Sequence, residues 1–284
     1  MNLNCREVEE VRVVIPEKDF QQTIEDLVLE SNKLNLEARK IYKEAEGMLL
    51  EELGLKDFEL DDDLYNVVNF SEVEAANRMD AEYFQPKYEK LIAKLKSQNA
   101  KLLPDVIQNV PAKFNPVAEP EKAFQYVELS NINSSIGVID GFSGIVGKEA
   151  PSRAKRILKE GDVMVSSIEG SLEKVALVAI EQERHLASTG FFQFRSNEIL
   201  PEVLLVLAKS LVFQMQLQKL TAGTILSAVP KEAINNVIVP ILARGTQEKI
   251  AELVRRSHES RKKAKELLES AKRQVEQIIE TQSK

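Results

Sequence analysis

Residues 237–240 read Val-Ile-Val-Pro, and a long helical pattern that opens at Gln247-Glu-Lys-Ile250 follows them. The same order occurs near the start of the chain, where Val13-Val-Ile-Pro16 precedes a second long helical pattern. The two helical stretches align at a constant offset of 226, which places Ser31 opposite Ser257. Two amphipathic helices can be alike by chance, but a strand and a proline ahead of both favour an internal repeat.

In both stretches apolar residues recur at alternating steps of three and four, which is the seam of a coiled coil. At every seventh position of the sequence the seam residue is small, and small residues let two helix backbones approach closely. The sequence therefore predicts two long helices that pair antiparallel, with Ala38 near Ser260–Ala264. The predicted pairing residues are Ile24, Leu27, Ser31, Leu34, Ala38, Ile41, Ala45, Ile250, Leu253, Ser257, Ala264, Leu267, Ala271 and Ile278.

Composition excludes several classes of protein. The 284 residues carry 38 basic and 45 acidic side chains, and the single cysteine, Cys5, excludes a disulfide framework or a cysteine-rich zinc site. No apolar run reaches the ~18 residues that a membrane span needs, and the polar first residues argue against a secretory signal. We therefore expect a cytoplasmic protein with no membrane partner.

Charge divides the chain into three parts. Residues 1–70 carry 8 basic and 18 acidic side chains, whereas residues 244–284 carry 11 and 7. The middle is nearly neutral, so any affinity for an anionic partner there depends on a local patch. Opposite charge on the two ends favours their pairing, although each exposed ion pair contributes only about 0–1 kcal/mol.

The middle of the chain has the pattern of an α+β domain. Asp80 is the expected N-cap of a helix that runs to Leu95, and Pro201 opens an apolar helix that runs to about Leu220. Short runs rich in β-branched and aromatic residues predict strands at 125–132, 162–168, 175–180, 191–195 and 237–240.

Motifs for catalysis are incomplete. Gly144-Ile-Val-Gly-Lys148 resembles part of a phosphate loop. That motif would need Gly at position 142 and Ser or Thr at position 149, but this chain has Phe142 and Glu149 there. His185 lies in a charged stretch typical of a solvated loop, and His258 lies off the seam on an expected solvated helix face. The pattern therefore predicts a protein without catalytic residues, metal or cofactor.

Basic and hydroxyl side chains gather around the glycine-rich turns and in one later loop. This cluster is either a solvated helix face or a set of phosphate contacts, because backbone-positioning contacts to DNA use such groups. The candidate DNA-binding residues are Lys148, Ser152, Arg153, Lys155, Arg156, Lys159, Thr221, Thr224 and Lys231.

Several motifs occur together in a familiar order: Arg78-Met-Asp-Ala-Glu-Tyr-Phe84, Tyr126-Val-Glu-Leu-Ser-Asn-Ile132, Pro151-Ser-Arg-Ala-Lys-Arg156 and Gly161-Asp-Val163. Their order resembles a target recognition domain of the specificity subunits of type I restriction–modification enzymes. The ending, with Val237–Pro240 before a long helix, is similar to the spacer region of that family. The usual family chain carries two recognition domains, so the resemblance implies that the first is missing here.

The resemblance implies a division into a strand remnant of the missing domain (1–18), a first spacer helix (19–56), an acidic connector (57–77), a recognition domain (78–243) and a second spacer helix (244–284). It also implies a non-catalytic reader of one half of a bipartite site in double-stranded DNA. Its helices would dock modification (methyltransferase) and restriction (motor and nuclease) subunits or a second copy of the chain. The alternative is a truncated coiled-coil interaction protein that does not bind DNA, and sequence-specific retention of DNA separates the two.

Overall fold

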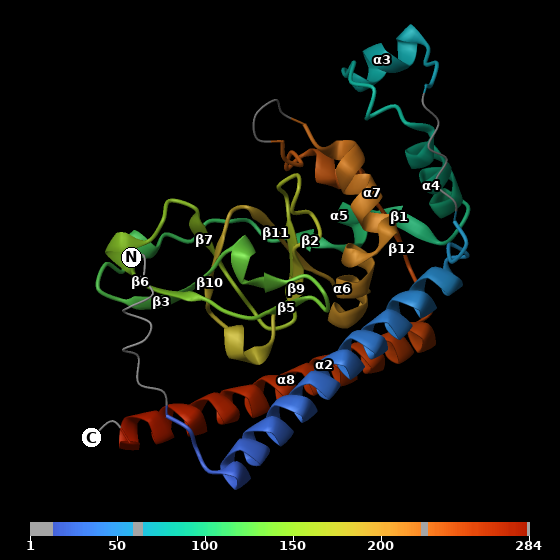
Figure 1. The fold of residues 1–284 in the computed structure, drawn as a ribbon. Coiled ribbons are helices and arrows are strands. Elements are labelled where there is room, and N and C mark those ends of the chain that lie inside the picture. The colour runs from blue at the N-terminus through green and yellow to red at the C-terminus, as the bar shows by residue number, and fades with distance from the viewer. Residues whose placement is uncertain (1–13, 59–64, 223–226, 283–284) are drawn as a thin grey trace. The chain divides into compact units, whose positions relative to one another are not determined.

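The computed structural model describes residues 14–58, 65–222 and 227–282, and it divides the chain into two compact units (Figure 1). The smaller unit comprises Met1–Lys40 and Arg256–Lys284, and the larger unit comprises Ile41–Arg255. Two long helices, α2 (Lys18–Glu52) and α8 (Arg244–Gln282), contribute to both units. The predicted α+β class, with two long helices and a mixed domain between them, is confirmed.

Within the smaller unit α2 and α8 run antiparallel. The Ser31 hydroxyl donates to the carbonyl of Ala264 at 2.8 Å, and the Ser257 hydroxyl donates to the carbonyl of Ala38 at 2.7 Å. A step of seven residues forward along α2 is thus a step of seven back along α8. The predicted pairing is confirmed, but Ala38 lies opposite Ser257, about one helical turn from the expected Ser260–Ala264.

The small seam residues are the ones that are fully buried in this unit. Ser31, Ala38, Ser257 and Ala264 are at most 1% exposed, and Ala271 is 3% exposed. The larger predicted seam residues are half-buried at its edges: Ile24, Leu27, Leu34, Leu267 and Ile278. In the larger unit, Ile41, Ala45 and Ile250 are buried and Leu253 is half-buried. The buried small residues are those expected where two helix backbones lie close together.

Two four-stranded sheets form the body of the larger unit. The first has the order β2-β11-β8-β9, all antiparallel, with β2 Gln108–Asn109, β11 Phe191–Arg195, β8 Val163–Ser166 and β9 Val175–Leu177. The second has the order β6-β3-β10-β7, with β6 Ser143–Val146, β3 Ala123–Val127, β10 Leu186–Ser188 and β7 Ala154–Ile157. Only the β3–β10 pair in this second sheet is parallel.

Short elements complete the larger unit. Two antiparallel pairs join β1 (Ala100–Leu102) to β12 (Ile238–Pro240) and β4 (Ile132–Asn133) to β5 (Val138–Ile139). The other α-helices among the described residues are α3 Phe70–Ala76, α4 Pro86–Lys96, α5 Leu103–Val106, α6 Pro201–Lys209 and α7 Leu211–Leu220. Single 3-10 turns lie at Pro116–Ala118, Leu129–Asn131, Gly147–Glu149, Ile180–Gln182 and Ala233–Asn236.

One hydrophobic core joins the first sheet to α4, α6, α7 and the adjoining ends of α2 and α8. Phe194 stacks on Phe192 with ring centroids 5.8 Å apart, and it meets Phe213 of α7 edge-on at 6.0 Å. Tyr42 and Leu49 of α2 belong to the same core and are 3% and 1% exposed. The compact unit therefore includes parts of both long helices as well as the predicted recognition domain.

The structure corrects two predicted helices. The expected helix from Pro201 to Leu220 is broken at Ser210, whose extended backbone (ψ 160°) ends α6 and whose hydroxyl donates to the carbonyl of Leu207 at 2.7 Å. The expected helix at Asp80 begins instead at Pro86, because the preceding residues form turns and proline suits the first helical position.

The predicted terminal strand is not confirmed, because residues 14–17 have no regular secondary structure and 1–13 lie outside the described residues. Within the described ranges, no single helix is long and apolar enough to span a membrane. The pair α6–α7 passes that test only when both halves are counted together, and it is bent by 59°.

Candidate nucleic-acid interface

The loop that follows α7 is closed by backbone hydrogen bonds. Ala222 and Ala228 each donate to the other's carbonyl at 3.0 Å, on either side of residues 223–226, which lie outside the described part of the chain. Thr224, a candidate DNA contact, is among those residues. Because its two ends are paired, the loop has a fixed base on the surface of the domain. We call residues 221–229 the recognition loop.

A serine-rich turn between β8 and β9 holds the recognition loop on one side. Glu169 donates its N–H to the carbonyl of Ser227 at 3.0 Å, and Val229 donates to the carbonyl of Ser167 at 2.8 Å. The turn is braced internally, since the hydroxyls of Ser166 and Ser171 lie 3.2 Å apart. Its polar backbone is therefore ordered before any ligand arrives, which lowers the entropic cost of binding.

The same turn connects the recognition loop to the predicted basic cluster. Ser167 donates both its N–H and its hydroxyl to the carbonyl of Gly190 at 2.9 Å, and the neighbouring Thr189 donates its N–H to the carbonyl of Arg153 at 2.8 Å. Thr189 and Gly190 are adjacent in the chain, so hydrogen bonds link Arg153 through this pair of residues to Ser167, and Ser167 to Val229. The two clusters that the sequence analysis treated separately are thus linked through the backbone of the segment Ser188–Gly190 and of the turn at Ser166–Ser171.

Most of the predicted basic cluster is exposed. Ser152, Arg153, Lys155 and Lys159 all have exposed side chains. Lys148 is exposed as well, but its ammonium group lies 3.2 Å from a carboxylate oxygen of Glu121. A phosphate that bound Lys148 would have to compete with that carboxylate.

Arg156 is the exception, and its prediction as a phosphate contact is wrong. The side chain is 3% exposed and donates from Nη1 to the carbonyl of Val110 at 2.6 Å. The segment is a strand, β7, rather than a helix, so Lys155 points outward and Arg156 points into the protein. Burial lowers the pKa of Arg156 to about 10.

The polar residues at the ends of the recognition loop differ in availability. The Thr221 hydroxyl donates to the carbonyl of Gln218 at 2.8 Å and so completes the last turn of α7. Lys231 follows the loop and has an exposed side chain. Of these two residues, Lys231 is therefore the better candidate for contact with a phosphate.

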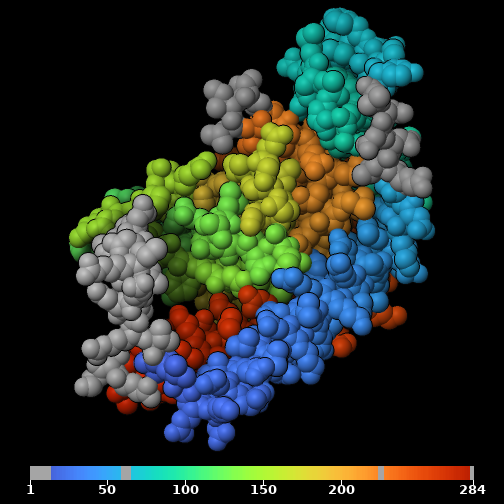
Figure 2. All heavy atoms as spheres, viewed as in Figure 1, coloured from blue at the N-terminus to red at the C-terminus, as the bar shows by residue number. Residues whose placement is uncertain are grey.

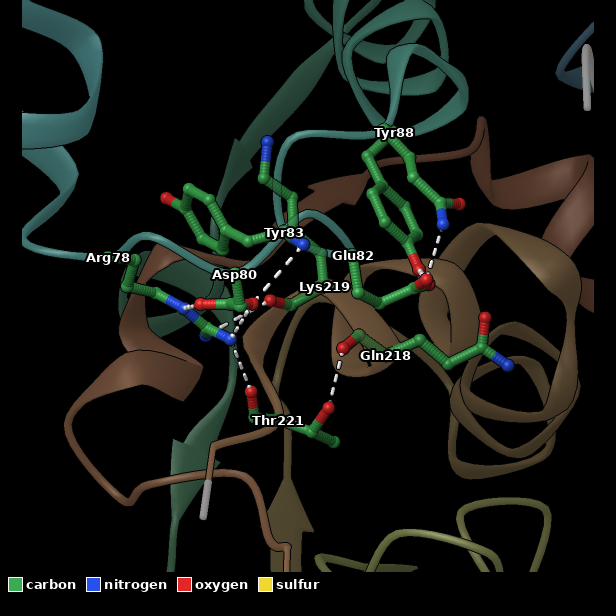
Figure 3. Close-up of polar contacts among 9 residues, drawn as sticks. Arg78, Asp80, Glu82, Tyr83, Tyr88, Gln218, Lys219 and Thr221 are labelled. Carbon is green, nitrogen blue, oxygen red and sulfur yellow. Dashed lines mark hydrogen bonds and ion pairs between the residues drawn. The ribbon is translucent and has the colours of Figure 1, made fainter. Parts of the chain in front are cut away.

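Arg78 anchors the first residues of the recognition loop (Figure 3). Its guanidinium donates to the carbonyl of Lys219 at 3.3 Å and to that of Thr221 at 2.8 Å. These carbonyls lie at the C-terminal end of α7, where orphan acceptors and the helix dipole favour a cation. Asp80 holds the guanidinium through two hydrogen bonds of 2.8 and 2.6 Å.

Aromatic and acidic side chains support this anchor. The ring of Tyr83 lies between Arg78 and Lys219, whose charged groups are 4.6 and 4.8 Å from its centroid. The hydrogen bond from Arg78 holds the pKa of Asp80 below its ordinary value. Asp80 is therefore the ionic partner of Arg78 and not the helix cap that its sequence position suggested.

No protein-family profile matches the chain, and no curated protein matches it. Among solved structures, a chain from a type I restriction–modification assembly and the HsdS subunit from Thermoanaerobacter tengcongensis each match with 29% identity and a TM-score of 0.50. This chain resembles HsdS specificity subunits of type I restriction–modification systems. The resemblance stated from the sequence motifs is thereby confirmed.

The match to each of these two HsdS-like neighbours covers 64% of this chain and 47% of theirs, so the chain spans about half the length of the structures it matches. The type I restriction–modification S subunit from M. genitalium also matches, at 15% identity and a TM-score of 0.46, over 95% of this chain and 63% of that one.

Two further polar groups in this HsdS-like domain are structural. Asp162 is fully buried and accepts hydrogen bonds from Arg195 at 2.7 and 3.0 Å and from Gln193 at 2.6 Å. His185, expected in a solvated loop, is 6% exposed and packs 5.2 Å from the ring centroid of Phe142. Burial lowers the pKa of His185. Among the described residues no group of His, Cys, Asp or Glu is arranged to hold a metal ion.

Sequence reasoning missed the turn at Ser166–Ser171 and the segment at Ser188–Gly190. Both consist mainly of small polar residues, and neither carries a charge cluster or a motif that marks it as functional. Their position became visible only from the backbone hydrogen bonds that join them to Arg153 and to the recognition loop. A serine-rich hairpin turn between two apolar strands was the only signal in the sequence.

Proposed function

We propose that this chain is the DNA-reading subunit of a type I restriction–modification system and that it contacts one half of a bipartite site. The observation that carries the proposal is the hydrogen-bonded series from Arg153 to Val229, which links the segment with exposed basic side chains to the base of the recognition loop. The similarity to HsdS subunits supports the same role.

Within these linked segments we assign different roles to different groups. Arg153, Lys155, Lys159 and Lys231 would contact phosphates, which fix the register of a protein on the duplex. The recognition loop and the turn at Ser166–Ser171 would approach base edges, where sequence is read. The Arg78 anchor would hold the recognition loop in one conformation.

The paired ends of α2 and α8 in the smaller unit would hold two readers at a fixed separation and dock the modification and restriction subunits. The buried small seam residues let the two helix backbones approach closely, and this close packing would keep the pair rigid. The chain itself would carry out no methyl transfer or strand cleavage, and it would act in the cytoplasm with the DNA that it reads.

Selection from a random duplex library tests the proposal. The purified chain should enrich one short half-site sequence over successive rounds, at a salt concentration where non-specific binding is weak. The double variant Arg153→Ala/Lys155→Ala should lose that enrichment, while Lys40→Ala/Lys43→Ala, which removes two exposed lysines of α2, should keep it. Failure of the wild-type chain to enrich any sequence would favour the alternative of a coiled-coil protein that does not bind DNA.

A further inference from the structure

Large apolar side chains are exposed together in the segment between α2 and α4. Tyr65 is 84% exposed, Val67 86%, Phe70 77% and Met79 89%, and α3 within this segment has no buried residue. Figure 2 shows the segment in cyan to teal on the surface. Single exposed apolar residues are normal, but a cluster of this kind marks a surface that another molecule covers.

Of these side chains, Tyr65, Phe70 and Met79 line a groove of about 390 Å³. Asn66 donates from Nδ2 to the carbonyl of Phe84 at 2.7 Å, which joins the two sides of the groove. The side chain of Glu72 accepts from the N–H of Asn69 at 2.7 Å and caps α3. The groove is lined by Tyr65, Asn66, Val68, Phe70, Val73, Met79, Ala81, Phe84, Gln85 and Pro86.

The described residues near the groove carry more acidic than basic charge. From Asp57 to Glu82 the part of the chain that the structure describes has five acidic residues and a single basic one, Arg78. Glu72, Glu74 and Glu82 are exposed. A negative surface repels the phosphates of DNA and attracts a cationic partner.

We infer that this groove docks a basic amphipathic helix of a partner protein. Apolar residues on one face of the helix would fill the groove and bury Phe70 and Met79. Lysine or arginine residues at the edges of that face would lie against the glutamates. This is the usual arrangement when a helix binds in a groove. The inference does not depend on DNA reading.

The groove and the anchor of the recognition loop share one stretch of chain. Met79, Ala81 and Phe84 line the groove, whereas Arg78 and Tyr83 contact the end of α7. A partner in the groove would therefore bind beside the residues that hold the recognition loop.

A labelled peptide tests the docking groove directly. The probe is a short fluorescein-labelled helical peptide of leucine and lysine in amphipathic order, and a leucine–glutamate peptide of the same pattern is its charge-reversed counterpart. In fluorescence anisotropy the chain should bind the basic peptide. The triple variant Tyr65→Ser/Phe70→Ser/Met79→Ser should bind it about tenfold more weakly or worse, because the apolar contacts are lost while the acidic charge stays.

The matched control is Leu29→Ser/Leu36→Ser, which removes two leucines of α2 that are 58% and 68% exposed, and its affinity should equal the wild-type value. All three altered groove residues are exposed, so circular dichroism melts should be unchanged. Equal affinity of the triple variant for the basic peptide, or equal binding of the acidic peptide, would overturn the inference. So would a self-association of the chain in sedimentation equilibrium that the triple variant abolishes, because the groove would then be filled by a second copy.

Discussion

The hydroxyl of Ser31 in α2 donates a 2.8 Å hydrogen bond to the carbonyl of Ala264 in α8. The hydroxyl of Ser257 in α8 donates in the same way to the carbonyl of Ala38 in α2 at 2.7 Å. The two hydrogen bonds are thus equivalent when the two helices are exchanged. Both hydroxyls and both alanines are buried. The internal repeat in the sequence thus corresponds to a repeated contact in the structure, and this contact fixes the register of the pair.

Enlarging one seam residue should destabilise this pair. Ala38→Leu inserts a bulky side chain where Ser257 reaches the backbone of α2, and overpacking of this kind costs typically about 1–3 kcal/mol. Lys40→Leu, at an exposed position of the same helix, should change the free energy of unfolding by at most ~0.5 kcal/mol. Urea denaturation of the two variants measures the difference. Equal stability of the variants would show that the seam is not tightly packed.

Removal of the loop anchor should free the recognition loop. Arg78→Ala deletes charge-assisted hydrogen bonds to the carbonyls of Lys219 and Thr221, and such bonds contribute roughly 1.5–3 kcal/mol each to the local structure. Hydrogen exchange at the amides of Ala222 and Ala228 should become about tenfold faster or more. Arg255→Ala, which breaks an ion pair between Arg255 and the half-buried Glu202, is the control and should leave these amides unchanged. Unchanged exchange in Arg78→Ala would contradict the anchoring role.

Exposed and buried basic residues at β7 should respond differently to mutation. Arg153→Ala/Lys155→Ala should flatten the slope of log affinity against log salt by up to about 2, since each phosphate contact contributes about 0.9, and should not alter folding. Arg156→Ala should instead lower the free energy of unfolding by about 1–3 kcal/mol, because the buried Arg156 side chain is lost and the carbonyl of Val110 loses its partner in a part-buried position. A flattened salt slope without loss of stability in Arg156→Ala would contradict the burial of this side chain.

The buried histidine should make stability depend on pH. Burial lowers the pKa of His185 below its ordinary 6.5, so below pH 6.5 the unfolded chain binds a proton that the folded chain resists. The folded state should therefore lose stability as the pH falls from 7 to 5. Because His185→Gln removes this titration, the variant should show a shallower decline in thermal melts. Parallel declines in both proteins would contradict a neutral, buried His185.

The sequence predicted the helix pair well because its signal is local and repeated. Small residues at every seventh position identify the seam in any register. The register itself depends on which serine hydroxyl donates to which backbone carbonyl, and the hydrogen bond from Ser257 places Ala38 opposite that residue. The strand at Phe191–Arg195 was also predicted, with the bounds that the structure shows. Its run of aromatic residues is typical of a buried strand, and all of these residues are buried.

The candidate site was harder to predict because it is assembled from distant loops. Basic charge identified Arg153 and Lys155, but the sequence could not show that β7 is a strand and that Arg156 therefore faces inward. The contacts from Arg78 to the end of α7 span more than 140 positions in the chain. Neither the periodicity of the sequence nor the spacing of its motifs indicates such a contact. Asp80 was therefore predicted as a helix cap, because its ion pair with Arg78 could not be seen in the sequence.

Sequence-specific affinity for DNA is the most direct measurement of the proposed role. The half-site selected from the random library would be compared with a duplex in which three of its base pairs are exchanged, at one fixed salt concentration. We predict at least about a hundredfold weaker binding to the altered duplex, because each wrong base pair typically costs about 1–3 kcal/mol. Equal affinity for the two duplexes would contradict the proposal that this chain reads DNA sequence.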